Sequence, residues 1–142
     1  MIPCADTSFL VSCYISDAHS VLADRQMAAS HSIQITPFNR AEFATAVFQQ
    51  VFLKRLLLNA AQQVWHNFEN DCKSGVLQFV HFPSSAWETA IDLARRHGPT
   101  LGNRTLDSLH VACALELGAD RFWTFDERQA RLAEAAGLNT SP

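Results

Sequence analysis

Four acidic residues lie far apart along a chain of 142 residues, each at a position from which folding could bring it to a common site. They are Asp6, Glu42, Asp107 and Asp126. Carboxylate oxygens are the ligands that magnesium and manganese prefer, and magnesium commonly binds one or two of them together with a substrate phosphate. Such ions activate water and stabilise the leaving oxygen of a phosphodiester. The four acids therefore predict phosphodiester hydrolysis that depends on Mg²⁺ or Mn²⁺, with either one or two ions.

Each acid also has a local structural explanation. Glu42 lies three residues after Asn39, as in a capping box, and Asp107 lies in the first turn of an expected helix, where negative charge is favourable. Asp126 fits an N-cap, and Asp6 is placed to stabilise the first turn of the helix that follows it. Capping explains the residue types but not why four capped ends would share one rim, whereas a metal site explains both.

The segments around these acids indicate an α/β fold. Short apolar runs alternate with longer helical stretches, which is typical of a parallel sheet joined by crossover helices. The expected strands cover residues 2–5, 32–36, 77–81 and 121–124, with a short last strand from 138. Ligands of such sheets bind beyond the carboxyl ends of the strands. With right-handed crossovers, the four acids are expected on one rim of the sheet.

Apolar residues at helical spacing predict the helices between these strands. The expected helices cover residues 8–14, 17–29, 39–58 (one helix or a pair), 59–73, 85–98 and 105–117, with a loop at 98–104 and a last helix from 126. Asn39, Thr105 and Asp126 are the expected N-caps. Gly75 and Gly118 suit the left-handed residue that commonly ends a helix.

The composition favours one globular domain over residues 1–142, because an apolar content of 48% is enough for a sizeable core at this length. The formal net charge of −3 provides no basic field of the kind that gathers nucleic acid. This charge counts against a plain RNA- or DNA-binding module. It counts less against a metal-dependent nuclease, because bound divalent cations offset the charge of the acids.

The cysteines are scattered and form no C-x-x-C pair, so neither a disulfide framework nor a structural zinc site is expected. They are Cys4, Cys13, Cys72 and Cys113, of which the first and last have apolar neighbours and suit a core. The N-terminal residues lack the basic and apolar regions of a signal peptide, and no apolar run is long enough to span a membrane. A cytoplasmic protein is therefore expected.

Four segments spread over the length of the chain carry a family resemblance. They are CADTSFL at residues 4–10, NRAEF at 39–43, LDSLHVA at 106–112 and TFD at 124–126. Together they resemble the PIN-domain nucleases, in particular the VapC-like toxin ribonucleases of bacterial toxin–antitoxin pairs. The resemblance implies a three-layer α/β/α fold with a central parallel sheet, and a magnesium- or manganese-dependent endoribonuclease. It also implies frequent homodimerisation and a cognate antitoxin that blocks the site.

The resemblance assigns roles to individual residues as well. The implied metal-site acids are Asp6, Glu42, Asp107 and Asp126, and the implied hydrogen-bonding supports that orient them are Thr7 or Ser8 and Thr124.

Two further residues are weighed from their own chemistry. Arg104, in the loop before Asp107, suits a contact with substrate phosphate, because arginine can bind phosphate through two parallel hydrogen bonds. A solvated loop charge is an equally good explanation. His110 lies three residues after Asp107 on the same helical side and could approach the site. A hydrogen-bonded core histidine is the favoured interpretation in such an apolar helix.

Other Asp-based sites fail on single residues. A haloacid-dehalogenase-like phosphatase needs a second Asp where the chain has Ser8, and a D-x-S-x-S adhesion site needs a serine at Leu10. A receiver domain needs an Asp after the third strand, where the chain has His81, Phe82 and Pro83. The alternative left open is a PIN-fold scaffold that binds RNA or protein without cutting, and DNA in place of RNA also stays open.

The stretch from Phe43 to Leu58 is apolar on more than one helical face. Because a domain normally buries one stripe of a helix, this width predicts a surface for a second copy of the chain or for an antitoxin. Phe48 and Phe52 are the residues expected to support such association. The alternative is that the helices of this stretch pack on each other.

Overall fold

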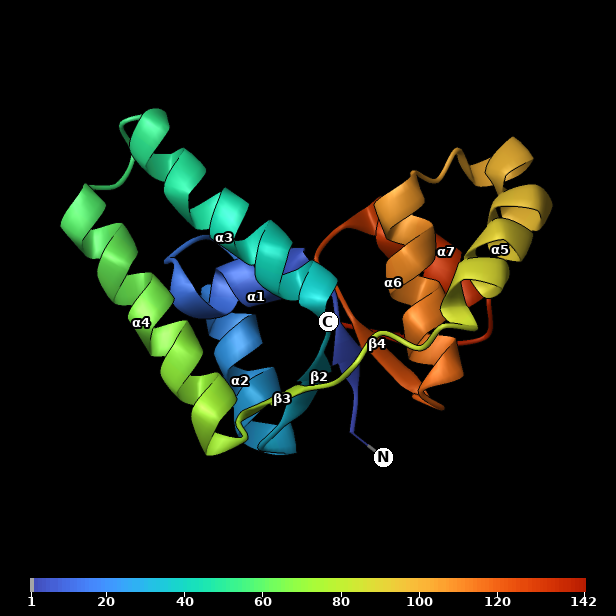
Figure 1. Ribbon diagram of the computed structural model, residues 1–142, viewed down its shortest axis with the longest axis horizontal. Helices are drawn as coiled ribbons and strands as arrows, with labels where there is room; N and C mark the ends of the chain where they lie inside the picture. Colours follow the sequence, from blue (N-terminus) through green and yellow to red (C-terminus); the bar gives the residue numbers. More distant parts are fainter. Residues whose placement is uncertain (1) are drawn as a thin grey trace.

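A computed structural model describes residues 2–142, whose central sheet is covered by helices on both faces (Figure 1). The strands are β1 (Cys4–Ala5), β2 (Ile33–Ile35), β3 (Leu77–Phe79), β4 (Arg121–Trp123) and β5 (Asn139–Ser141). They lie in the order β3-β2-β1-β4-β5, and all four pairings are parallel. The expected α/β class with a central parallel sheet is confirmed.

Seven helices connect and follow these strands within residues 2–142. They are α1 (Thr7–Tyr14), α2 (Ser20–Ser30), α3 (Pro37–Phe52), α4 (Leu58–Ser74), α5 (Ala86–Leu101), α6 (Thr105–Glu116) and α7 (Glu127–Ala135). Helices α1 to α4 lie on one side of the sheet and α5 to α7 on the other, which gives the expected three layers (Figure 1).

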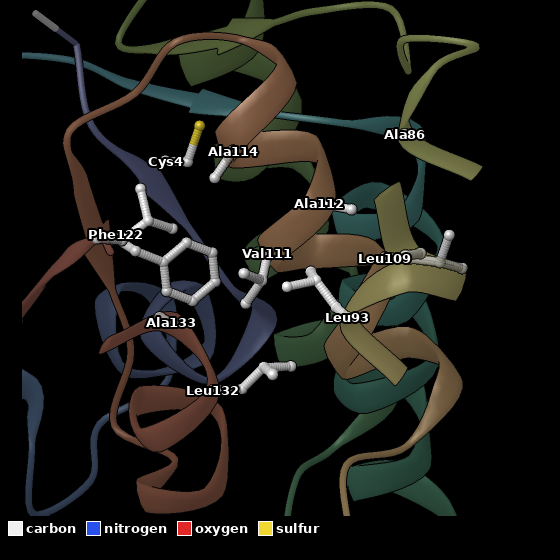
Figure 2. Packing of buried hydrophobic residues seen from close by; sticks show 12 residues of the cluster. Cys4, Ala86, Leu93, Leu109, Val111, Ala112, Ala114, Phe122, Leu132 and Ala133 are labelled. Carbon is white, nitrogen blue, oxygen red and sulfur yellow. The ribbon is translucent and has the colours of Figure 1, made fainter. Parts of the chain in front are cut away.

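The alternation of side chains along the strands separates two apolar cores. In β1, Cys4 packs into the core on the α5–α7 side, and Ala5 packs into the core on the α1–α4 side. In β4, Phe122 and Trp123 divide in the same way, because successive residues of a strand point to opposite faces. Figure 2 shows the first core, in which the Phe122 ring lies beside Val111 of α6. Both central strands are thus buried on both faces, as parallel strands usually are.

Two helices begin elsewhere than the sequence indicates. Helix α3 is preceded by Thr36, so the prediction that Asn39 is its N-cap is wrong. The Asn39 side chain instead accepts a hydrogen bond from the Thr36 N–H at 2.9 Å, which satisfies a donor ahead of the first turn. Helix α2 begins at Ser20, not near 17, because Asp17 and Ser20 exchange hydrogen bonds in a turn before it.

The expected loop at residues 98–104 is largely helical. Helix α5 continues through Pro99 to Leu101, and Gly102 at a φ of 64° ends it by donating to the Gly98 carbonyl at 2.8 Å. The proline removes one helical hydrogen bond, and packing of α5 along α6 stabilises the remaining turn. Thr105 is consequently the first residue of α6 and not its cap, which corrects a second N-cap prediction.

All four cysteines are free, and Cys4 and Cys113 are buried as small core residues, as expected. Over residues 2–142, no helix combines the length and the apolar character that a membrane crossing requires.

Candidate active site

Asp6 directly follows β1 and accepts three hydrogen bonds. Its Oδ1 accepts from the Ser8 hydroxyl at 2.6 Å and from the Phe9 N–H at 3.1 Å. Its Oδ2 accepts from the Thr124 hydroxyl at 2.5 Å. Burial raises the pKa of Asp6 above its ordinary value of 3.8, and the hydrogen bonds offset only part of this effect. The charge of this carboxylate is therefore costly in the isolated protein, and a nearby cation would relieve that cost.

Strand pairing explains how Asp6 meets Thr124. Ala5 of β1 pairs with Trp123 of β4, so the next residues leave two parallel neighbouring strands at the same level. The Thr124 hydroxyl lies 3.2 Å from that of Ser8 and accepts a hydrogen bond from the Asp126 N–H at 2.9 Å. The carboxyl ends of β1 and β4 thus connect Asp6 to the start of α7.

Glu42 reaches the same region from the second turn of α3. Its Oε1 accepts hydrogen bonds from the Thr7 hydroxyl at 2.8 Å and from His110 Nε2. Burial raises the pKa of Glu42, but the hydrogen bond and charge of His110, the Thr7 hydroxyl and the charge of Arg104 outweigh it. The net pKa of Glu42 lies below its ordinary range, so this carboxylate is ionised at neutral pH.

The carboxylates of Asp107 and Asp126 both lie near the guanidinium group of Arg104. Arg104 Nε lies 3.2 Å from Asp107 Oδ2, and Arg104 Nη2 lies 3.8 Å from Asp126 Oδ2. Asp107 Oδ2 also accepts from the Arg104 N–H at 3.0 Å, which fixes the first turn of α6. Asp126 Oδ1 accepts from the backbone N–H groups of residues 128 and 129, which confirms its N-cap role for α7.

Hydrogen bonds and a shared arginine therefore connect Asp6, Asp126 and Asp107, and Glu42 bonds to residues close to two of them. Asp6 connects through Thr124 to the backbone of Asp126, and Arg104 spans Asp126 and Asp107. Glu42 joins through His110, which follows Asp107 by one turn of α6. The structural and the functional explanation of these acids are therefore compatible. Asp6, Asp107 and Asp126 stabilise the first turns of α1, α6 and α7, and they also lie near one another.

Three polar residues at this rim were assigned other roles, or none, from the sequence. His110 is buried, as a core histidine would be, yet it contacts Glu42, and its spacing from Asp107 was the signal for that contact. Asn39 donates to the Ala5 carbonyl at 3.0 Å and so ties α3 to β1. Gln129 donates to the Asp107 carbonyl at 3.1 Å and ties α7 to α6. Nothing in the local sequence of Gln129 indicates this long-range bond.

The donor chemistry of the rim fits a hard divalent cation, because the four candidate ligands are carboxylates. Their present spacing is more open than a ligand set requires. Among the residues that the structure describes, no three Asp, Glu, His or Cys side chains are grouped to hold a metal ion. Arg104 takes the cationic place beside Asp107 and Asp126, so an ion bound there would displace its guanidinium.

Comparison with known proteins gives one family and a consistent fold. The family model described as PIN domain matches residues 4–135. A crystal structure of Mycobacterium tuberculosis VapC20, described as a sarcin–ricin loop cleaving toxin, is similar at 20% identity with a TM-score of 0.69. The similarity covers 97% of this chain and 98% of that one. PAE2754 from Pyrobaculum aerophilum is similar at 15% identity and a TM-score of 0.66, over 99% of this chain and 83% of that one. No curated protein matches the chain.

Proposed function

The chain belongs to the PIN domain family, and on this premise we propose that it is a metal-dependent endoribonuclease that hydrolyses RNA phosphodiester bonds. The observation that supports this proposal most is that hydrogen bonds and Arg104 link Asp6, Asp107 and Asp126 near the carboxyl ends of β1 and β4. Glu42 is bonded to Thr7, the residue after Asp6, and to His110, one turn after Asp107. Strand ends of this kind are where parallel sheets bind ligands. A bound Mg²⁺ or Mn²⁺ would supply an activated water and stabilise charge on the leaving oxygen.

In this proposal the chain's own residues orient that chemistry. The acids that would hold the ion are Asp6, Glu42, Asp107 and Asp126. Ser8 and Thr124 fix the Asp6 carboxylate, and Thr7 and His110 fix the Glu42 carboxylate. Arg104, once released from its acids, would bind a substrate phosphate through its guanidinium.

The proposed biological role is that of a toxin in a toxin–antitoxin pair that acts in the cytoplasm, where its RNA substrate would be found. It is supported by the resemblance to VapC-like ribonucleases and by a fold similar to that of a toxin described as cleaving the sarcin–ricin loop. The partners are then an RNA, a cognate antitoxin and a second copy of the chain.

A non-cleaving PIN-fold scaffold is the second candidate. One observation favours it: Arg104 pairs with Asp107 and Asp126, so a side chain of the protein itself already offsets part of their charge. The two candidates differ in turnover, which an RNA cleavage assay measures directly.

The test incubates the purified chain with total cellular RNA and maps new RNA ends, with manganese or with EDTA. We expect cleavage with manganese and none with EDTA. Asp6→Asn should lower the rate about 100-fold or more, because loss of groups that merely support a ligand already costs about 10–100-fold. Asp24→Asn, an exposed acid on α2, is the matched control and should cleave normally.

Cleavage that persists in both Asp6→Asn and Asp107→Asn would refute the nuclease proposal. A folded wild-type chain that leaves every RNA intact with manganese would favour the scaffold.

A further inference from the structure

A hollow of about 420 Å³ lies directly beside Asp126, and all of its lining residues are charged. They are Arg104, Asp126, Glu127, Arg128 and Arg131. Three arginines against two carboxylates make this hollow positive, although the chain as a whole has a net charge of −3. We refer to it as the arginine hollow. Its positive charge is local, so the composition of the chain conceals it.

The guanidinium groups of the arginine hollow are available to a ligand. The side chains of Arg104 and Arg131 are 64% and 68% exposed, and Arg128 is exposed as well. Arg131 pairs only loosely with Glu127, at 3.8 Å, and the Glu127 side chain is 89% exposed. Such exposed pairs contribute about 0–1 kcal/mol, so an anion can displace them at little cost.

Arg104 belongs both to the arginine hollow and to the carboxylate rim. Arg104 lies 3.2 Å from Asp107 and 3.8 Å from Asp126. Because Asp126 also lines the hollow, the hollow adjoins the carboxylate rim directly. Arg128 and Arg131 lie three residues apart on α7 and therefore project from the same side of that helix. The guanidinium groups of Arg128 and Arg131 thus continue along α7 from the position of Arg104 at the rim.

We propose that the arginine hollow binds the sugar–phosphate backbone of single-stranded RNA next to the bond that is cut, with Arg128 and Arg131 as positioning residues. This inference rests on the proposed nuclease function and names the path of its substrate. Guanidinium groups bind phosphate oxygens through paired hydrogen bonds, and such backbone contacts fix the register of a nucleic acid. A protein partner is a poorer match, because the centres of protein interfaces are depleted in charged residues and every residue that lines the hollow is charged.

The test measures binding of a fluorescein-labelled single-stranded oligouridylate by fluorescence anisotropy over a range of salt concentrations. The Asp6→Asn chain is used throughout, with manganese, so that cleavage does not intervene. Adding Arg128→Ala and Arg131→Ala should weaken binding about tenfold or more near 0.1 M salt. The slope of log affinity against log salt should become shallower by about 1.4, since each lost single-strand phosphate contact removes about 0.7.

The matched control adds Arg25→Ala and Arg95→Ala, which remove two exposed arginines from α2 and α5. This control should keep both the affinity and the salt slope. Two further variants separate charge from geometry. Arg128→Lys with Arg131→Lys should keep the salt slope but lose several-fold in affinity, because lysine lacks the paired donors. Glu127→Gln should tighten binding several-fold, because it removes a carboxylate that competes for Arg131.

The outcomes distinguish this inference from the proposed function. If the double alanine variant matches the control in affinity and slope, the arginine hollow does not bind RNA, even when the wild-type chain cleaves RNA. If the wild-type chain never cleaves RNA but the double variant loses affinity and slope, the RNA path stands without the nuclease. If RNA binding is unchanged and poly-glutamate binding is lost, the hollow serves an acidic protein and the assignment is overturned.

Discussion

At the residue scale, Asp6 shows most clearly what the candidate site costs the fold. Its carboxylate is buried after β1, where three hydrogen bonds orient it without fully offsetting its loss of solvation. Residues positioned for a ligand commonly lower stability in its absence. Removing the charge while keeping the shape of the side chain should therefore stabilise the metal-free protein.

We predict that Asp6→Asn raises the melting temperature in EDTA at pH 7 by about 2–6 °C, since 1 kcal/mol shifts it by a few degrees at this size. The pKa of Asp6 is raised in the folded state, so its charge destabilises the fold above that pKa. The difference between the variant and the wild type should shrink as pH falls through the raised pKa toward 3.8. Scanning calorimetry at several pH values measures this difference in melting temperature. A variant less stable than the wild type at pH 7 would contradict this prediction.

At this scale, the positions of the acids in the fold could be predicted from the sequence better than their contacts. Asp6 and Asp126 follow strands and could be placed from pattern alone, because the carboxyl ends of parallel strands meet at one edge. The bridge made by Arg104 and the bond between His110 and Glu42 depend on how α6 docks beside α3. That docking is set by tertiary packing and leaves little local signal.

At the element scale, the hairpin of α3 and α4 divides its apolar residues between two environments. Phe43 and Val47 are fully buried against the α4 side chains of the core, which confirms that the helices pack on each other there. Toward the tip, the side chains are open to solvent: Phe52 is 84% exposed and Leu57 is 75% exposed. Exposed apolar residues gathered in this way commonly mark an interaction surface, so the association surface stays a prediction for this tip.

We predict that Phe52→Ser with Leu57→Ser converts a dimer of the chain into a monomer. The free energy of unfolding of the monomer should change by no more than about 0.5 kcal/mol per site, since exposed positions contribute little to the core. Sedimentation equilibrium measures the molecular mass in solution, and urea unfolding measures the free energy of unfolding. Phe43→Ala is the contrasting variant and should cost about 3–5 kcal/mol of stability, because it empties a buried site. An unchanged molecular mass in the double serine variant would refute the tip as the dimer surface.

The order and type of the elements follow from periodicity, and their ends do not. Strand and helix patterns predicted the alternation seen from β1 to α7, because burial on both sheet faces imposes apolar runs and stripes. The cap of α3 is Thr36 and not Asn39, and Asn39 takes the place in the capping box that was expected for Glu42. Helix α5 continued through Pro99 because packing on α6 outweighs one lost hydrogen bond.

At the scale of the whole molecule, charge is segregated. A chain with a net charge of −3 places Asp6, Asp107 and Asp126 near the carboxyl ends of β1 and β4, and three arginines in the adjacent hollow. Net charge is therefore a poor guide to which ligands this region would bind, because the field near the site differs from the average. The sequence predicted the acidic half of this arrangement, and only the folded chain brings Arg104 to α7.

The central claim is that four remote carboxylates act as one cation site, and manganese binding followed by titration calorimetry tests it most directly. The wild-type chain should bind Mn²⁺ saturably. Asp6→Asn, Glu42→Gln, Asp107→Asn and Asp126→Asn should each weaken binding about tenfold or more, with Asp24→Asn unchanged. The account would be contradicted if Asp6→Asn and Asp107→Asn bound Mn²⁺ as tightly as the wild type. It would also be contradicted if a folded wild-type chain showed no saturable Mn²⁺ binding.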